Sequence, residues 1–86
     1  MSEIINLRNR IEQIDDEIAK LICQRQLSVK CLDILKKYNK MQVRNLEIEK
    51  SKISRVRAIA KDHSIDPKIT EDVIRILISH SILAQV

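Results

Sequence analysis

The sequence predicts an all-α protein, a three-helix protomer whose first helix is too long to be covered by its own chain. The 86 residues include no Gly, Trp or Phe and only one Pro, and 33% are charged, a composition typical of helices. Apolar residues recur every three or four positions over long stretches, which is the period of an amphipathic helix. A chain this short folds as one domain with a small core, so we expect a single helical domain over residues 1–86.

The first helix is predicted from about Glu3 to Lys37. One stripe runs along it through Leu7, Ile11, Ile14, Ile18, Leu21, Arg25, Ser28, Leu32 and Leu35. At about 1.5 Å per residue this helix is about 50 Å long, which exceeds the diameter of a globule of this size. We therefore expect a partner chain to cover part of the stripe.

Two shorter helices are predicted after a connector around residues 38–42. The second begins near Asn45, a good N-cap, and ends near His63. The third begins at Asp66-Pro67, an N-cap followed by proline at the first helical position. The expected inward residues are Leu46, Glu49, Ile53, Val56 and Ala60 on the second helix and Ile74, Leu77, Ile78, Ser81 and Gln85 on the third.

Polar residues interrupt the inward face of every helix. Arg25 stands in the apolar stripe of the first helix, where a guanidinium is costly unless an anion meets it. The anion is either a protein carboxylate, with Glu49 as the candidate, or a bound ligand. Lys36, eleven residues on, shares the helix face of Arg25. Each group alone is explained by an ion pair or by solvent, but together with Ser81 they predict a polar pocket between helices.

Such a pocket, with cations, neutral donors and one carboxylate, suits a small dianionic substrate. The sequence shows no Ser/His/Asp or Cys/His set and no metal-ligand spacing. The chemistry would therefore depend on conformational restraint and charge stabilisation, without a nucleophile.

Two classes of partner are disfavoured. The net charge of +4 comes from Lys and Arg interleaved with acidic residues, and a single aromatic residue offers little base stacking, so nucleic acid is not expected. No apolar run approaches the ~20 residues that span a bilayer, and no secretory leader is evident, so we expect a cytoplasmic protein with no membrane contact.

Five motifs follow one another over nearly the whole chain: Leu7-Arg8-x-x-Ile11-x-x-x-Asp15, Leu21-x-x-x-Arg25, Lys36, Val43-Arg44-Asn45-x-x-x-Glu49 and Ser81-x-x-x-Gln85. Their order and spacing resemble those of the all-helical class of chorismate mutases (type II). The resemblance implies an intertwined homodimer with two equivalent active sites. It also implies rearrangement of chorismate to prephenate without a cofactor, in the shikimate pathway of aromatic amino-acid biosynthesis or related metabolism.

The resemblance assigns a role to each polar residue. Arg25 would bind a substrate carboxylate, with Ser81 beside it. Lys36 would contact the other carboxylate and the ether oxygen, to which Gln85 would donate a second hydrogen bond. Glu49 would accept from the ring hydroxyl.

Two further residues would complete the site. The backbone at Asn45 would assist Glu49, and Arg8 would come from the other subunit. The helix geometry agrees with the second assignment, because Arg8 lies about 25 Å from Arg25 along one axis and cannot reach the pocket of its own chain. If Arg8 reaches no pocket, it is a surface arginine.

One departure from the pattern bears on activity. The family usually has Arg before the ring-hydroxyl Glu, where this chain has Ile48. The loss of that cation predicts weak activity or an altered substrate, unless Arg44, one turn earlier, leans into the gap.

Three alternatives stay open from the sequence. Two are sister activities on the same scaffold, a mutase for 4-amino-4-deoxychorismate and an isochorismate-pyruvate lyase, the second disfavoured by the retained Glu49. The third is a non-catalytic helical dimer that binds a partner protein.

Overall fold

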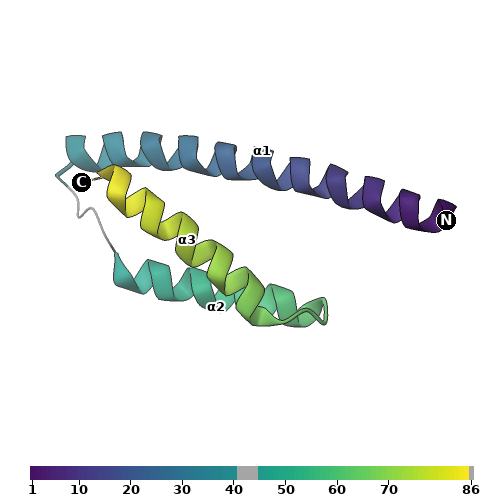
Figure 1. Ribbon diagram of the computed structural model, residues 1–86. Coiled ribbons are helices and arrows are strands. Elements are labelled where there is room, and N and C mark those ends of the chain that lie inside the picture. The colour runs from purple at the N-terminus through teal and green to yellow at the C-terminus, as the bar shows by residue number, and fades with distance from the viewer. Residues whose placement is uncertain (41–44, 86) are drawn as a thin grey trace.

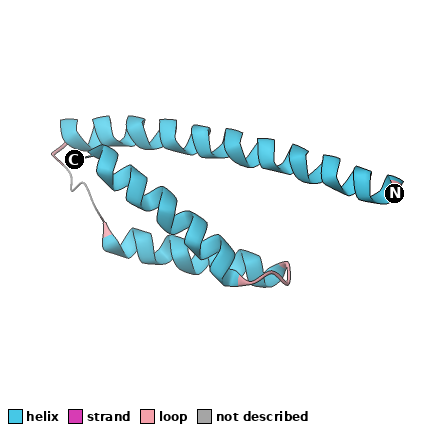
Figure 2. Ribbon diagram, in the orientation of Figure 1, coloured by secondary structure: helices cyan, strands magenta, loops and turns pink. Residues whose placement is uncertain are grey.

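The computed structural model describes residues 1–40 and 45–85, with side chains described up to Ser81 (Figures 1 and 2). Three helices account for almost all of these residues: α1 (Ser2–Tyr38), α2 (Leu46–Asp62) and α3 (Pro67–Gln85). The all-α prediction is confirmed, and each expected boundary lies within about one residue of the observed one.

The ends of α2 and α3 are fixed by local hydrogen bonds. Asn45 Oδ1 accepts a hydrogen bond from the backbone N–H of Ile48 at 3.2 Å, which confirms it as the N-cap of α2. Asp66 Oδ1 accepts from the backbone N–H of Lys68 at 3.0 Å, immediately before α3 begins at Pro67. Both caps were expected from the sequence.

A tight turn after α2 sends the chain back along itself. Ser64 adopts a left-handed conformation with φ of 58°, and its N–H donates to the carbonyl of Lys61 at 3.0 Å. The N–H of Ile65 donates to the carbonyl of Ala60 at 2.9 Å. These two bonds form a Schellman motif, which usually places glycine where this chain has Ser64.

The turn allows α2 and α3 to pack as a hairpin (Figure 1). Ala60 and Ile78 are the buried apolar residues in the described part of the chain. The predicted inward residues of both helices are buried or half-buried as far as Ser81, except that Leu46 is 57% exposed, and the side chain of Gln85 lies outside the described part. Leu46 is the first residue of α2 and lies beyond the region that α3 covers.

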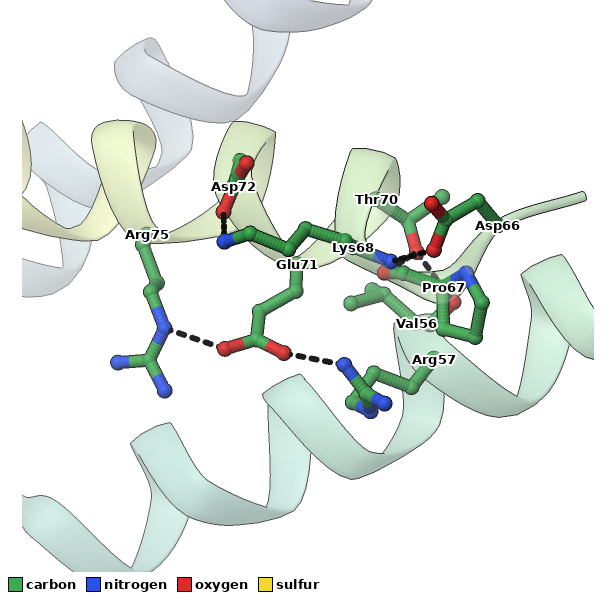
Figure 3. Close-up of polar contacts among 9 residues, drawn as sticks. All are labelled: Val56, Arg57, Asp66, Pro67, Lys68, Thr70, Glu71, Asp72 and Arg75. Atoms are coloured by element: carbon green, nitrogen blue, oxygen red, sulfur yellow. Dashed lines mark hydrogen bonds and ion pairs between the residues drawn. The ribbon is translucent and has the colours of Figure 1, made fainter.

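Polar contacts join the two helices of the hairpin (Figure 3). The Glu71 carboxylate of α3 binds Arg57 of α2 through one oxygen and Arg75 of its own helix through the other. The Thr70 hydroxyl donates to the backbone carbonyl of Val56 at 2.8 Å. The guanidinium of Arg75, followed by that of Arg57, lowers the pKa of Glu71 by hydrogen bonding.

In the described part of the chain, the long helix α1 contacts the hairpin only where its C-terminal half meets α3 (Figure 1). Its covered face consists of Ile22, Arg25, Gln26, Val29, Asp33 and Lys36. The expected apolar stripe is therefore not buried within the chain, apart from the half-buried Arg25. Leu7 is 63% exposed and Leu35 is 58% exposed, because α3 reaches α1 with its own C-terminal part, far from Leu7, and lies against an adjacent face of the helix (Figure 1).

The exposed surface of the protomer is larger than its mass predicts. A compact protein of 10.0 kDa exposes roughly 5,200 Å², whereas this chain exposes 7327 Å². The radius of gyration is 16.3 Å, against about 12 Å for a compact chain of this length. The excess comes from α1, whose apolar stripe has no intramolecular partner. No helix in the described ranges 1–40 and 45–85 is long and apolar enough to span a membrane.

Candidate active site

Arg25 joins α1 to the C-terminal part of α3. Its Nη1 donates to Ser81 Oγ at 3.1 Å and to Gln26 Oε1 at 2.6 Å. Ser81 is only 6% exposed. Its hydroxyl donates to the carbonyl of Leu77 at 2.7 Å, which leaves an oxygen lone pair for the guanidinium. Because both acceptors of Arg25 are neutral, they orient its positive charge without neutralising it.

The other two predicted charges, Lys36 and Glu49, come from α1 and α2. Lys36 is half-buried on the covered face of α1, and Glu49 is half-buried on α2. The charges of Lys36 and Glu49 both act on the pKa of Lys52 of α2. Burial lowers the pKa of Lys52, as do the charges of Arg25 and Lys36, whereas Glu49 acts in the opposite direction. The predicted residues Arg25, Lys36 and Glu49 therefore act on one region.

Three residues of this region were not predicted from the sequence: Gln26, Asp33 and Lys52. Gln26 and Asp33 are seven residues apart on the covered face of α1, and Asp33 is 8% exposed. Its Oδ1 is buried without a hydrogen-bond partner. The helical spacing of these residues could have indicated a covered face. This face has only two apolar residues, Ile22 and Val29, so its pattern is less evident in the sequence than the stripe through Leu7.

The other predicted site residues are placed differently. Arg8 is exposed on the N-terminal half of α1, far along the helix from Arg25. Asn45 is exposed, and its side chain caps α2. Arg44 lies outside the described residues. Gln85 is the last residue of α3, one turn after Ser81, and its side chain also lies outside the described part.

The arrangement offers cations and neutral hydrogen-bond donors for an anion. Among the described residues, no group of three or more His, Cys, Asp or Glu side chains is arranged to hold a metal ion. Arg25 is already oriented, and Lys36 lies about three turns further along the same covered face of α1. Two cations on one covered face favour a ligand with more than one negative group.

Comparison with known proteins agrees with the sequence resemblance. Residues 7–86 match the family described as chorismate mutase type II. The protein named chorismate mutase from Methanocaldococcus jannaschii is 30% identical over 81 residues, which cover 94% of this chain and 82% of that protein. No solved structure gives a significant match.

Proposed function

This chain belongs to the chorismate mutase type II family and is a chorismate mutase, and we propose that it acts as a homodimer with two shared active sites. The reaction rearranges chorismate to prephenate by breaking a C–O bond and forming a C–C bond within one molecule. The observation that supports the site is the hydrogen bonding of Arg25. Its guanidinium is oriented by Gln26 and Ser81, which are neutral and do not compensate its charge. A substrate carboxylate supplies the missing charge.

The homodimer is supported by the surface that α1 leaves uncovered. The protomer exposes about 2,000 Å² more than a compact protein of its mass. Burying such an area on each of two chains falls in the range of obligate dimers. The apolar stripe from Leu7 to Leu35 runs along this surface, so a second α1 packed antiparallel is the natural partner.

An antiparallel partner also gives Arg8 a role. Arg8 precedes Arg25 by seventeen residues and lies in the N-terminal half of α1, where all the residues up to Leu21 are exposed. The reversed direction of the partner helix brings its Arg8 toward the Arg25 end of the first chain. Each site would then take Arg25, Lys36, Glu49 and Ser81 from one subunit and Arg8 from the other.

The proposed chemistry follows the growth of charge on the ether oxygen. Negative charge develops there only as the C–O bond breaks, so donors aimed at this oxygen stabilise the transition state more than the substrate. Lys36 is the cationic donor and Gln85 the neutral one. Glu49 accepts from the ring hydroxyl, with the backbone at Asn45 beside it, and Arg44, four residues before Ile48 in the sequence, is the candidate replacement for the missing cation.

A spectrophotometric assay for loss of chorismate, with the product identified by mass, tests this function. We expect a product of unchanged mass, because the reaction is an isomerisation. Release of pyruvate would instead indicate the lyase activity. Preference for 4-amino-4-deoxychorismate would indicate the amino substrate, and a folded dimer with no turnover would indicate a non-catalytic protein.

A variant of Arg25 tests whether the reaction takes place at this site. Arg25→Ala should lower kcat/KM at least 100-fold, since it removes a charge-assisted contact to the substrate. Arg75→Ala is the matched control and should retain activity, because Arg75 is exposed and pairs with Glu71, which is not a predicted site residue. Equal activity of the two variants would place the reaction elsewhere.

A further inference from the structure

One nitrogen of the Arg25 guanidinium makes both of its hydrogen bonds to other described residues. Nη1 donates to Gln26 Oε1 at 2.6 Å and to Ser81 Oγ at 3.1 Å. The other two nitrogens, Nε and Nη2, donate to no described residue, and no described carboxylate forms an ion pair with Arg25. The guanidinium is therefore held at one end, and its opposite edge is left for a ligand.

The two acceptors at Nη1 come from different helices. Gln26 follows Arg25 on α1 and is half-buried on the covered face, whereas Ser81 belongs to α3. The Ser81 oxygen lies 3.4 Å from Gln26 Oε1, but its single proton is used in the shorter bond to the carbonyl of Leu77 at 2.7 Å. Both oxygens therefore act as acceptors toward Arg25, and the shorter of the two bonds is the one to Gln26.

This arrangement decides which edge of Arg25 a carboxylate can use. Arginine binds a carboxylate best through two parallel N–H bonds, and with Nη1 occupied the edge formed by Nε and Nη2 is the one that offers them. A side chain that is already held loses less conformational freedom when the ligand binds. Gln26 can therefore contribute to affinity without contacting the substrate.

The neutral charge of Gln26 is as important as its hydrogen bond. A glutamate at this position is almost the same size and would accept the same bond from Nη1. Its carboxylate would also offset the charge of Arg25 and repel a substrate carboxylate. The change from amide to carboxylate therefore separates the holding of Arg25 from the availability of its charge.

We propose that Gln26 is a positioning residue of the active site, which holds Nη1 of Arg25 so that the Nε–Nη2 edge binds a substrate carboxylate with its charge uncompensated. This proposal rests on the proposed role of Arg25 in substrate binding. Gln26 acts through Arg25 and not on the reacting atoms, so its effect is expected mainly in KM.

The test compares Gln26→Glu with Gln26→Met in steady-state kinetics with chorismate. Gln26→Glu should raise KM about 10- to 100-fold with a smaller change in kcat, because it cancels the charge of Arg25. Gln26→Met keeps the side-chain length and adds no charge, so it should raise KM only about fivefold while the bond to Ser81 remains. A purely structural role predicts the reverse order, because glutamate preserves the hydrogen bond and methionine removes it.

The matched controls are Gln24→Glu and Gln24→Met. Gln24 is exposed on the same helix and points about 160° away from Gln26 around the axis. Both controls should change KM less than about twofold. Urea unfolding provides a second readout: Gln26→Glu should unfold at the same or a higher urea concentration than the unsubstituted protein, because its carboxylate can pair with Arg25. Lower affinity would then occur without lower stability.

The outcomes for Gln26 and for the function are distinct. If the unsubstituted protein converts chorismate and Arg25→Ala does not, the proposal is overturned when Gln26→Glu behaves like Gln24→Glu or when Gln26→Met has the higher KM. The function stands in both cases. If Arg25→Ala keeps its activity, the proposal is overturned together with the site, and if the unsubstituted protein does not convert chorismate, the function is overturned as well. A KM that rises from the unsubstituted protein to Gln26→Met to Gln26→Glu, without loss of stability in Gln26→Glu, supports the proposal.

Discussion

At the scale of single residues, the Ser81 hydroxyl controls how Arg25 is presented. Since Ser81 donates its proton to the carbonyl of Leu77 at 2.7 Å, its oxygen is left to accept from Arg25 at 3.1 Å. A buried hydroxyl in this arrangement fixes a cation without competing for the substrate's negative charge. The same position occupied by a carboxylate would hold Arg25 more tightly but would cancel the charge that binds substrate.

We predict that Ser81→Ala lowers kcat/KM for chorismate about tenfold, because a hydrogen bond to a charged group is lost and Arg25 becomes less ordered. Ser79→Ala is the matched control. The Ser79 hydroxyl also bonds to backbone carbonyls of its own helix, those of Arg75 and Ile76, but it is exposed. Steady-state kinetics of both variants provide the measurement, and an equal response of the two would contradict the role given to Ser81.

A second residue-scale prediction concerns Asp33, whose Oδ1 is buried without a partner. An unsatisfied buried polar atom costs about 1–3 kcal/mol, so Asp33→Ala should raise the free energy of unfolding by a similar amount. Asp16→Ala, at an exposed position of the same helix, should change it by less than about 0.5 kcal/mol. Urea unfolding at equal protomer concentration measures both. A lower stability for Asp33→Ala would mean that the carboxylate is satisfied in the assembled protein.

At the scale of elements, the turn between α2 and α3 holds a serine in the conformation that glycine prefers. The left-handed conformation costs a residue with a Cβ about 1–2 kcal/mol, partly offset in glycine by its larger chain entropy. Ser64→Gly should therefore stabilise the protein by up to about 1 kcal/mol. Ser54→Gly, within α2, should destabilise it by about 0.5 kcal/mol. Thermal unfolding of the two variants should give shifts of opposite sign.

The contact of Glu71 with Arg57 and Arg75 predicts how the hairpin responds to acid. Because its pKa is lowered from the ordinary value of 4.5, Glu71 stabilises the fold above that value, and this contribution is lost as the pH falls through the lowered pKa. Glu71→Gln should therefore lower the melting temperature at pH 7, and the difference should vanish in acid. Asp72→Asn is the comparison, since Asp72 is 52% exposed and pairs only with the exposed Lys68, and it should have a smaller effect at every pH.

The helices themselves could be predicted almost completely from the sequence, but their faces only in part. Caps such as Asn45 and Asp66 act within a few residues, so the sequence alone determines the ends of α2 and α3. The covered face of α1 depends on where α3 crosses it, which is a tertiary property. The apolar stripe through Leu7 and Leu35 was therefore predicted correctly as a stripe, although it is not buried within the chain.

The residues of the candidate site could also be predicted only in part. Arg25 and Ser81 were predicted because one interrupts an apolar stripe and the other lies on an inward face. Asp33 was missed because its burial depends on where α3 crosses α1, which the sequence does not show.

At the scale of the whole molecule, the main feature is the large exposed face of α1, which the proposed dimer would cover. A helix of 37 residues is covered only near its C-terminal end, and the chain is 57 Å in its longest dimension but only 23 Å and 16 Å in the others. A monomer with such an exposed apolar stripe would be marginally stable, so we expect folding and dimerisation to be coupled. Both the stability and the activity of this protein would then depend on the same interface.

Mixed dimers provide the last prediction, because they test the interface and the site together. Arg8→Ala and Arg25→Ala should each abolish nearly all activity, since each removes one arginine from both sites of its own homodimer. When the two variants are unfolded and refolded together, a mixed dimer contains one site with both arginines and one site with neither.

With random pairing, half of the dimers are mixed, so about a quarter of all sites should be intact and about a quarter of the original activity should return. The control refolds Arg8→Ala with the double variant Arg8→Ala/Arg25→Ala, where no pairing produces an intact site. Mass spectrometry under native conditions verifies that mixed dimers form in both experiments. Mixed dimers without recovered activity would show that Arg8 does not act across the interface, because the shared site is the only arrangement in which two inactive chains restore each other.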